Sequence, residues 1–233
     1  MKSRLPVVVK VESGFSLIEL LVVVGIMGVM ATMVLFYANA HRKLYQPDEQ
    51  ALLLADMLQE GRQRALTERR TMRVEINLTT NTARLYDENR DSTVSTDDVL
   101  LKGMNLFAAA NVRVDTRPSE ISYNPPETMN VPNAVFAPSV YPPSISQSVC
   151  TIRFLANGTA VNAGTNAVGT GAVPTGLTLH IWSPKASNNA QSDIARSITV
   201  LGATGVIRLW EFDRNSTLTN KWKDSRRSSS YGG

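Results

Sequence analysis

The chain has 233 residues, of which 43% are hydrophobic and 19% are charged. This composition is typical of a folded protein and excludes an intrinsically disordered chain, and the length suits one anchored domain. The formal net charge of +4 is too small an excess to indicate a nucleic-acid-binding protein. Cys150 is the single cysteine, which excludes an intramolecular disulfide, and we expect this residue to be buried in a strand.

The first predicted element is an apolar helix near the N-terminus. Residues 20–40 contain no Asp, Glu, Lys or Arg, and such a run is long enough to cross a membrane, which takes roughly 20 helical residues. A short basic segment with Lys2, Arg4 and Lys10 precedes it. Glu19 lies in the apolar segment with no basic residue among its helical neighbours. Because a carboxylate there needs a proton or a cation, we expect Glu19 to have a function.

Residues 14–19, Gly-Phe-Ser-Leu-Ile-Glu, form the most specific motif of the chain. They resemble the G-[FM]-[ST]-L-[IV]-E signal of type IV pilins and type II secretion pseudopilins. The resemblance implies that a prepilin peptidase cuts between Gly14 and Phe15, removes leader residues 1–14 and methylates Phe15. It also implies that residues 15–40 form a transmembrane and assembly helix, in which Glu19 meets the N-terminus of a neighbouring subunit.

Two other interpretations of this segment are open. Residues 38–40, Ala-Asn-Ala, look like the cleavage site of a secretory signal peptide, but the apolar run exceeds the about 7–15 residues of such a signal. The second interpretation is a single-span anchor that carries a periplasmic domain without a role in assembly. Neither interpretation gives Glu19 a purpose.

Residues 41–70 are predicted to continue as an amphipathic helix. Pro47, Asp48 and Glu49 form a helix-start signature, although a proline here also fits a kink in one long helix. Apolar residues then recur at spacings of three and four. Because this face is rich in alanine and only weakly lipophilic, we expect it to pack on a sheet. The face consists of Ala51, Leu54, Ala55, Leu58 and Ala65, with Leu66 at its margin.

Residues 71–213 are predicted to form an antiparallel β domain, which makes the fold class α+β. The alternation of residues 72–78, a short turn and residues 83–86 together indicate a hairpin. Seven of the eleven prolines lie in residues 118–143, which predicts an extended loop or a surface insertion. The Gly-rich residues 157–176 indicate a second, mobile loop. Further strands are predicted at 99–101, 105–114, 150–155, 177–182, 197–201 and 206–212.

Two later stretches, residues 153–160 (Arg-Phe-Leu-Ala-Asn-Gly-Thr-Ala) and residues 196–208, resemble the GspH/FimT branch of these proteins. The resemblance implies a minor pilin or pseudopilin that is anchored in the bacterial inner membrane, with a periplasmic globular domain, and later joins a periplasmic or cell-surface filament. Its implied partners are other pilin or pseudopilin subunits, prepilin peptidase and the inner-membrane assembly platform. Many relatives carry a cysteine pair where this chain has one cysteine. Some relatives carry a Gly-Arg-x-Arg element that is linked to DNA binding. In this chain Val206 stands in place of the first arginine of that element, and only the second, Arg208, remains.

Residues 87–98 have oxygen-bearing side chains at the spacing of a calcium loop. Two departures from that pattern are Ser92, in place of the turn glycine, and an aspartate in place of the final bidentate glutamate. Two interpretations stay open: a structural Ca²⁺ site, as in several related pseudopilins, and a solvated acidic hairpin loop. No other cofactor is expected. The predicted ligands are Asp87, Asn89, Asp91, Thr93, Ser95 and Asp98.

Residues 214–233 are predicted to be a basic, flexible tail. As an alternative function, a DNA-capturing or adhesive minor pilin could use this tail, with cations on phosphates and an indole stacked on a base. A soluble, flexible terminus is the favoured interpretation. The nucleic-acid residues in that alternative are Arg208, Lys221, Trp222, Lys223, Arg226 and Arg227.

The sequence indicates no enzyme. His41 falls at the membrane edge and His180 lies in an apolar strand, and neither is paired with a nucleophile and an acid. We therefore expect His180 to be a sheet residue.

Overall fold

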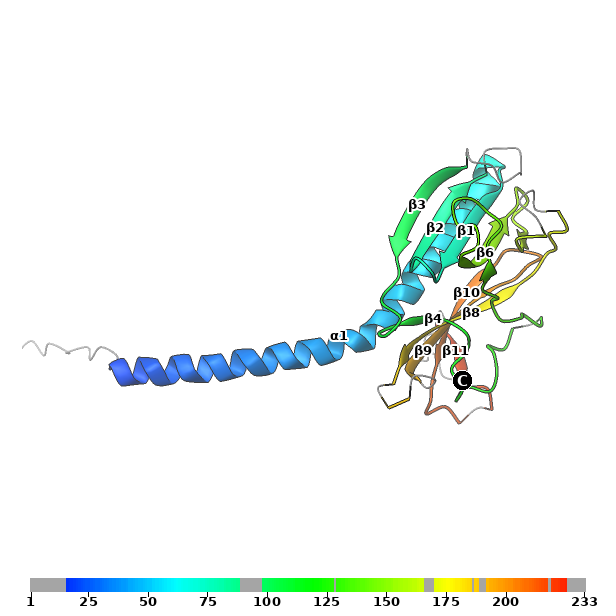
Figure 1. The fold of residues 1–233 in the computed structure, drawn as a ribbon. Coiled ribbons are helices and arrows are strands. Elements are labelled where there is room, and N and C mark those ends of the chain that lie inside the picture. Colours follow the sequence, from blue (N-terminus) through cyan, green and yellow to red (C-terminus); the bar gives the residue numbers. More distant parts are fainter. Residues whose placement is uncertain are drawn as a thin grey trace, which may run out of the picture. The chain divides into compact units, whose positions relative to one another are not determined.

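The computed structural model describes residues 16–88, 98–127, 129–165, 170–185, 187–188, 192–217 and 219–225. The chain divides into two compact units, Met1–Arg42 and Lys43–Gly233. The first unit holds the N-terminal part of a long helix, and the second holds the rest of this helix and two antiparallel sheets (Figure 1). The expected α+β fold class is confirmed.

Helix α1 (Leu17–Glu68) is one continuous helix that contains Pro47. The start signature at Pro47 therefore marks no separate helix, as the kink interpretation allowed. Ser16 precedes α1, and its Oγ accepts a hydrogen bond from the backbone N of Glu19 at 3.2 Å, as an N-cap residue does. The helix ends before Arg69, whose φ of 54° interrupts the helical path.

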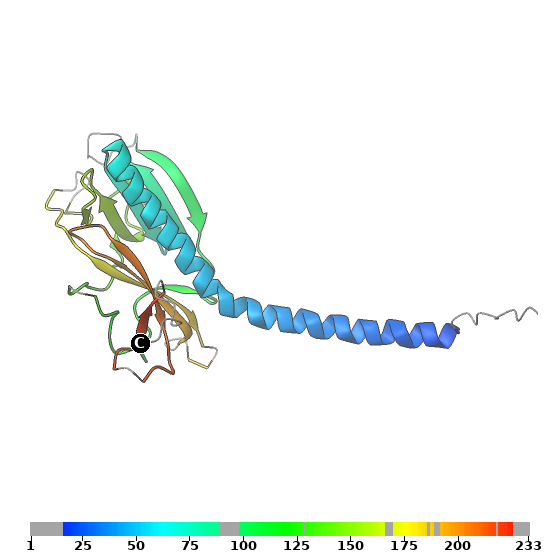
Figure 2. The same cartoon turned by 180° about the vertical axis from the view of Figure 1, so that it is seen from behind.

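The part of α1 within the second unit packs its apolar face on the sheets, as predicted (Figure 2). Gly61 lies at the closest contact: a Cβ atom there would be 3.1 Å from Leu85 Cδ1 and 3.2 Å from Val74 Cγ2. Leu66, at the margin of the face, is 38% exposed. The predicted face residues Ala51, Leu54, Ala55, Leu58 and Ala65 are all buried.

The first sheet has the strand order β3-β2-β1-β6-β5, and β7 also pairs with β6. The predicted hairpin is confirmed as β1 and β2, which pair from Met72↔Asp87 to Asn77↔Thr82. Strand β1 pairs on its other side with β6, some 70 residues later in the chain, with Arg73 opposite Arg153. The strands are β1 (Met72–Asn77), β2 (Thr82–Asp87), β3 (Val99–Asn105), β5 (Ala137–Pro138), β6 (Ser148–Phe154) and β7 (Ala160–Val161).

The second sheet has the order β11-β10-β9-β8-β4. Its inner residues, such as Leu179 and Ile198, join the core under α1, while the alternate residues, such as His180 and Ser197, point to the other side. The strands are β4 (Arg113–Asp115), β8 (Leu177–Pro184), β9 (Ser192–Val200), β10 (Ile207–Phe212) and β11 (Trp222–Asp224).

The proline-rich segment covers the side of the second sheet that faces away from α1. Residues 132–134 of the segment lie beside β8 in the plane of the sheet, where Thr178 donates its backbone N–H to Pro132 O at 2.7 Å and its carbonyl accepts from Ala134 N at 2.8 Å. Ile121 is 2% exposed and belongs to a second apolar cluster with three tryptophans. The segment is extended, as predicted, and it lies at the surface: residues such as Ile121 are buried against the sheet, while others, such as Val135, are exposed. The cluster consists of Ile121, Trp182, Ala195, Trp210 and Trp222.

Two predictions about this domain were wrong. The expected strand at 105–114 is interrupted: its ends belong to β3 and β4, and between them the backbone N–H groups of Asn111 and Val112 both bond to Ala108 O in a turn. The expected flexible tail contains strand β11, which pairs with β10 from Trp210↔Asp224 to Phe212↔Trp222. This strand exists because Trp222 completes the second apolar cluster.

Candidate functional site

The apolar part of α1 is the first candidate site. Residues Leu17–Tyr37 have a mean hydropathy of 2.5, none of them is buried, and the segment is long enough to cross a membrane. Glu19 lies in its first turn, where Ser16 and Glu19 have the spacing of a capping box. Gly14 and Phe15 lie outside the described residues, so the cleavage site stays a prediction, as does the assembly role of Glu19.

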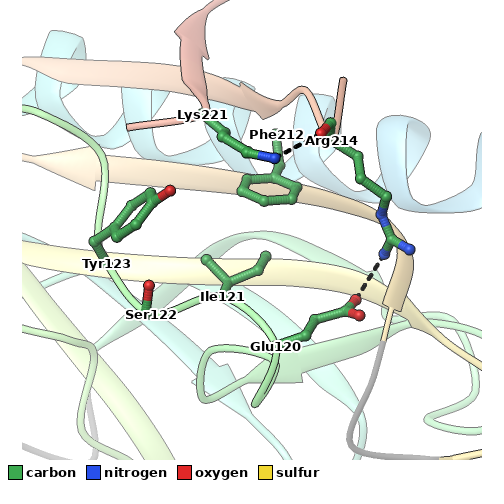
Figure 3. A pocket seen from close by; sticks show the side chains of 7 residues that line it. All are labelled: Glu120, Ile121, Ser122, Tyr123, Phe212, Arg214 and Lys221. Carbon is green, nitrogen blue, oxygen red and sulfur yellow. Dashed lines mark hydrogen bonds and ion pairs between the residues drawn. The ribbon is translucent and has the colours of Figure 1, made fainter. Parts of the chain in front are cut away.

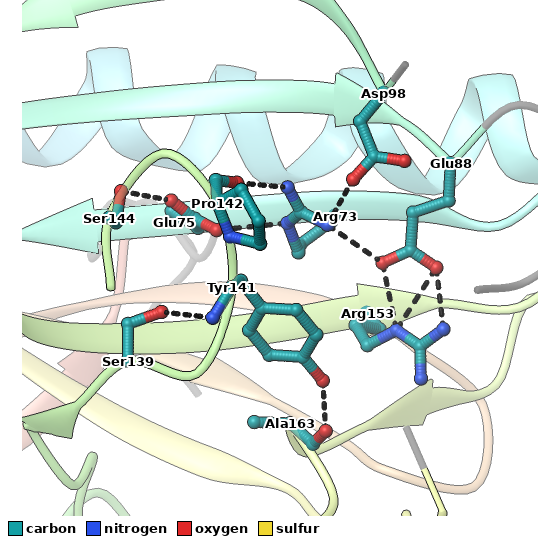
Figure 4. A network of polar contacts seen from close by, with 10 residues as sticks. All are labelled: Arg73, Glu75, Glu88, Asp98, Ser139, Tyr141, Pro142, Ser144, Arg153 and Ala163. Atoms are coloured by element: carbon teal, nitrogen blue, oxygen red, sulfur yellow. Dashed lines mark hydrogen bonds and ion pairs between the residues drawn. The ribbon is translucent and has the colours of Figure 1, made fainter. Parts of the chain in front are cut away.

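A second candidate site is a buried cluster of charged side chains on the side of the first sheet that faces away from α1 (Figure 4). Its centre is Arg73 of β1, which is fully buried. The Nε atom of Arg73 lies 2.9 Å from Glu75 Oε1, and its Nη1 lies 2.6 Å from Asp98 Oδ2. Glu88 Oε1 is 3.4 Å from Nη1, and Nη2 donates to Pro142 O at 3.3 Å.

Two tyrosines and a second arginine complete this cluster. The rings of Tyr86 and Tyr141 have their centroids 4.7 and 5.0 Å from Arg73 Cζ, which places the guanidinium against both π-faces. Arg153 binds Glu88 with an Nη2–Oε2 distance of 2.5 Å. Burial raises the pKa of the Glu88 carboxyl, and the hydrogen bond from Arg153 offsets part of this effect.

The cluster holds both ends of the acidic segment that was predicted to bind calcium. Glu88 directly precedes residues 89–97 and Asp98 directly follows them, and Arg73 contacts both side chains. The base of this segment is therefore fixed to the sheet by charge-assisted hydrogen bonds.

Of the predicted calcium ligands, the structure describes Asp87 and Asp98. Asp87 Oδ2 lies 2.8 Å from Arg70 Nη1, and Asp98 pairs with Arg73. Over the described parts of the chain, no group of three or more His, Cys, Asp or Glu residues could hold a metal ion. A calcium ion would have to compete with these two arginines, and the site stays a prediction. Its test is whether millimolar Ca²⁺ raises the Tm and whether Asp87→Ala combined with Asp91→Ala abolishes that rise. The other predicted ligands, Asn89, Asp91, Thr93 and Ser95, lie outside the described residues.

The predicted nucleic-acid residues that the structure describes, Arg208, Lys221, Trp222 and Lys223, do not form a common surface strip. Trp222 is 3% exposed, and its Nε1 donates to Tyr123 O at 2.9 Å. The prediction that this indole stacks on a base is therefore wrong. Arg208 Nη1 lies 2.9 Å from Oε2 of the buried Glu127 carboxylate, which offsets its charge. Lys223 pairs with Asp213. Lys221 Nζ donates to the carbonyl oxygen of Arg214 at 2.8 Å, and Arg226 and Arg227 lie outside the described residues.

The remaining candidate side chains are core residues. His180 is fully buried in β8, as expected, with Nε2 3.4 Å from Asn133 Oδ1. Burial, together with the charge of Arg117, lowers the pKa of His180 to about 3. Cys150 is buried in β6, also as expected, and burial raises the pKa of its thiol to about 12. The side chain of His41 lies outside the described residues.

Sequence reasoning missed the buried charge cluster. Arg73 and Glu75 alternate with apolar residues in β1, which is the pattern of a strand whose polar side faces solvent. The available signal was an arginine and a glutamate two residues apart in one strand. The second arginine, Arg153, comes from β6, and local periodicity does not reveal that pairing.

Comparison with known proteins adds two similarities. The family described as "Prokaryotic N-terminal methylation motif" matches residues 9–35. No curated protein matches the sequence. Among solved structures, the chain is similar to the type IV minor pilin FimU of Pseudomonas aeruginosa (strain PAO1), with 17% sequence identity and a TM-score of 0.41, over 72% of this chain and 90% of that one. The methylation motif confirms the predicted resemblance to type IV pilins in the N-terminal segment, and the α+β fold described above is the one that this resemblance implied.

Proposed function

We propose that this protein is a minor pilin or pseudopilin, a structural subunit of a bacterial type IV pilus or type II secretion pseudopilus. One observation carries the proposal: the methylation motif at residues 9–35 overlaps an apolar helix, Leu17–Tyr37, none of whose residues is buried in the chain itself. Such a helix needs lipid or other subunits around it. In the proposal it anchors the precursor in the inner membrane and then packs against neighbouring subunits in the filament.

Glu19 has a defined role in this proposal. It is the acid within Leu17–Tyr37, and the structure places it in the first helical turn. After cleavage following Gly14, the new N-terminus of a neighbouring subunit supplies a cation, because an α-amino group has a reference pKa of about 8. Pairing the two removes the cost of an isolated charge in an apolar environment. Prepilin peptidase and the inner-membrane assembly platform are the other proposed partners.

The first test concerns processing. Mass spectrometry of the mature protein should find methylated Phe15 at the N-terminus, and Gly14→Val should leave the full-length precursor. A mature chain that starts at His41 would instead establish a secretory signal peptide and overturn the proposal.

The second test concerns assembly. Glu19→Ala should be inserted and cleaved normally, but site-specific cross-links between subunits should become much weaker. Glu49→Ala is the matched control, since Glu49 is an exposed carboxylate on the same helix outside the apolar segment. Equal cross-linking of both variants would mean that Glu19 has no assembly role, whereas a parent protein that forms no cross-links between subunits would establish the simple-anchor interpretation.

A further inference from the structure

A cavity of about 240 Å³ opens at one end of the second sheet, between the proline-rich segment and the chain that follows β10 (Figure 3). This volume is below the range of about 300 to 1,000 Å³ that is typical for sites of drug-sized ligands, so the cavity suits a ligand about the size of one ring. Its lining residues are Glu120, Ile121, Ser122, Tyr123, Phe212, Arg214 and Lys221.

The inner wall of the cavity is apolar and packs on the second apolar cluster. Figure 3 shows the rings of Phe212 and Tyr123 and the side chain of Ile121 gathered around one space. Phe212 packs edge-to-face on the buried Trp222, with ring centroids 5.2 Å apart and an interplanar angle of 65°. Ile121 is itself buried in the second apolar cluster. A flat or ring-shaped ligand would therefore meet a preformed surface and would not have to order it.

The rim of the cavity carries an excess of positive charge. Glu120 accepts hydrogen bonds from Arg214 Nη2 at 2.8 Å and from Ser192 N at 2.8 Å, and Lys185 Nζ lies 3.4 Å from it. Its negative charge is thus already offset. Lys221 Nζ donates at 2.8 Å to the carbonyl oxygen of Arg214, which carries no charge to offset the ammonium group. Among the lining residues, two cations, Arg214 and Lys221, stand against one carboxylate, and this excess of positive charge favours an anionic ligand.

We propose that this cavity binds a small carboxylate attached to a six-membered ring. The ring lies against Phe212 and Tyr123, and the carboxylate accepts a hydrogen bond from the Lys221 ammonium group, which has donors beyond the one used by the carbonyl. The ring can be aromatic or a sugar, because both present a flat apolar face to an aromatic wall. The shared chemistry is one negative charge next to one ring.

Intrinsic fluorescence of the full-length protein in detergent micelles provides the binding test. All three tryptophans of the chain, Trp182, Trp210 and Trp222, lie in the cluster behind the cavity wall, so emission excited at 295 nm reports on this region. Phenylacetate should change the emission saturably, with a Kd on the order of millimolar for so small a ligand. Phenylacetamide, which has the same ring without the charge, and acetate, which has the charge without the ring, should each bind several-fold more weakly. Glucuronate, measured in parallel with glucose, distinguishes a sugar acid from an aromatic acid as the preferred source of the carboxylate.

Two lysine variants locate the site. Lys221→Gln should weaken binding of the preferred carboxylate by roughly three- to tenfold, because it removes one half-exposed ion pair. Lys102→Gln is the matched control: Lys102 lies on β3 of the other sheet and pairs with Glu60, and its removal should leave binding unchanged. The proposal is overturned if neither ring carboxylate binds at 10 mM to the folded protein, if phenylacetamide or acetate binds as tightly as phenylacetate, or if Lys221→Gln binds like the parent.

Discussion

Arg73 joins its own strand to three later parts of the second unit. It contacts Glu75 in its own strand, Glu88 at the end of β2, Asp98 before β3, and the carbonyl of Pro142 in the proline-rich segment. All three carboxylates are buried, so each depends on a nearby cation to remain ionised. The fold in this region therefore depends on one guanidinium group.

Replacing Arg73 should be strongly destabilising. Arg73→Met leaves Glu75 and Asp98 without their main cation, and breaking a buried ion pair from one side costs about 3–5 kcal/mol. The measurement is urea unfolding followed by circular dichroism. Arg64→Met is the control, since Arg64 also contacts two carboxylates but is 40% exposed, and its loss should cost about 1 kcal/mol or less. Similar losses in both variants would contradict the role of the buried cluster.

His180 should make the fold sensitive to acid. In the folded protein its pKa is about 3 because the ring is buried, against about 6.5 in the unfolded chain. The unfolded state therefore binds a proton that the folded state does not bind, and the free energy of unfolding falls as the pH decreases below 6.5. Between pH 7.5 and pH 5 the His180 contribution to this loss is on the order of 2 kcal/mol.

The comparison of the parent with His180→Gln isolates this contribution. Burial raises the pKa of Glu75 and of Glu88, which changes the stability in the opposite sense at low pH, but both proteins share that effect. The unfolding free energy of the variant should therefore fall less between pH 7.5 and pH 5 than that of the parent. Parallel pH dependences would contradict the assignment.

At the scale of elements, the two sides of α1 within the second unit have different tolerance to charge. Leu58→Asp should unfold this unit, because the carboxylate would be buried against the sheets, and burying an unpaired charge costs several kcal/mol. Leu52→Asp lies on the same helix, but Leu52 is 54% exposed, so the same substitution should change stability by about 0.5 kcal/mol or less. Thermal melts of the two variants test the prediction, and a Leu58→Asp protein that melts like Leu52→Asp would refute the packing.

The elements that sequence alone predicted are those with a strong local pattern. The helix face at Leu54 and Leu58 repeats every three or four residues, and the hairpin of β1 and β2 alternates around a turn, so both follow from neighbours in the chain. Strand β11 has three residues and forms only because β10 and the second cluster are beside it. The place of the proline-rich segment likewise depends on a distant contact, the pairing of Thr178 with the backbone near Pro132.

Two glycines of the recognised C-terminal motifs have a structural explanation that the sequence did not supply. Gly158 has a φ of 81°, and a Cβ atom there would lie 2.9 Å from Leu66 Cδ2 on α1. Gly205 has a φ of 60°, and its Cβ would lie 2.2 Å from Gly158 O. Both turns approach α1 or each other so closely that a side chain does not fit. The motif was visible in the sequence, but its cause is a tertiary contact.

At the scale of the whole molecule, the stability of the second unit should not depend on the apolar helix. None of the residues Leu17–Tyr37 is buried, and in the described chain both apolar clusters consist of residues between Ala51 and Trp222. The boundary between the two compact units falls between Arg42 and Lys43, inside helix α1. The amphipathic half of the helix is thus part of the globular fold, and in the proposed function the apolar half packs in the membrane or the filament.

A chain that starts at Lys43 should therefore be soluble and should melt in one cooperative transition, near the Tm of the full-length protein in detergent. A second chain that starts at Met72 lacks α1 and is the control: its sheets would expose the residues that pack on Leu54 and Leu58, so it should aggregate or melt without a cooperative transition. Scanning calorimetry distinguishes these outcomes. If the chain from Lys43 also lost its cooperative transition, the apolar half of α1 would contribute to the stability of the globular unit. The prediction that this unit is stable without the apolar half would then be refuted.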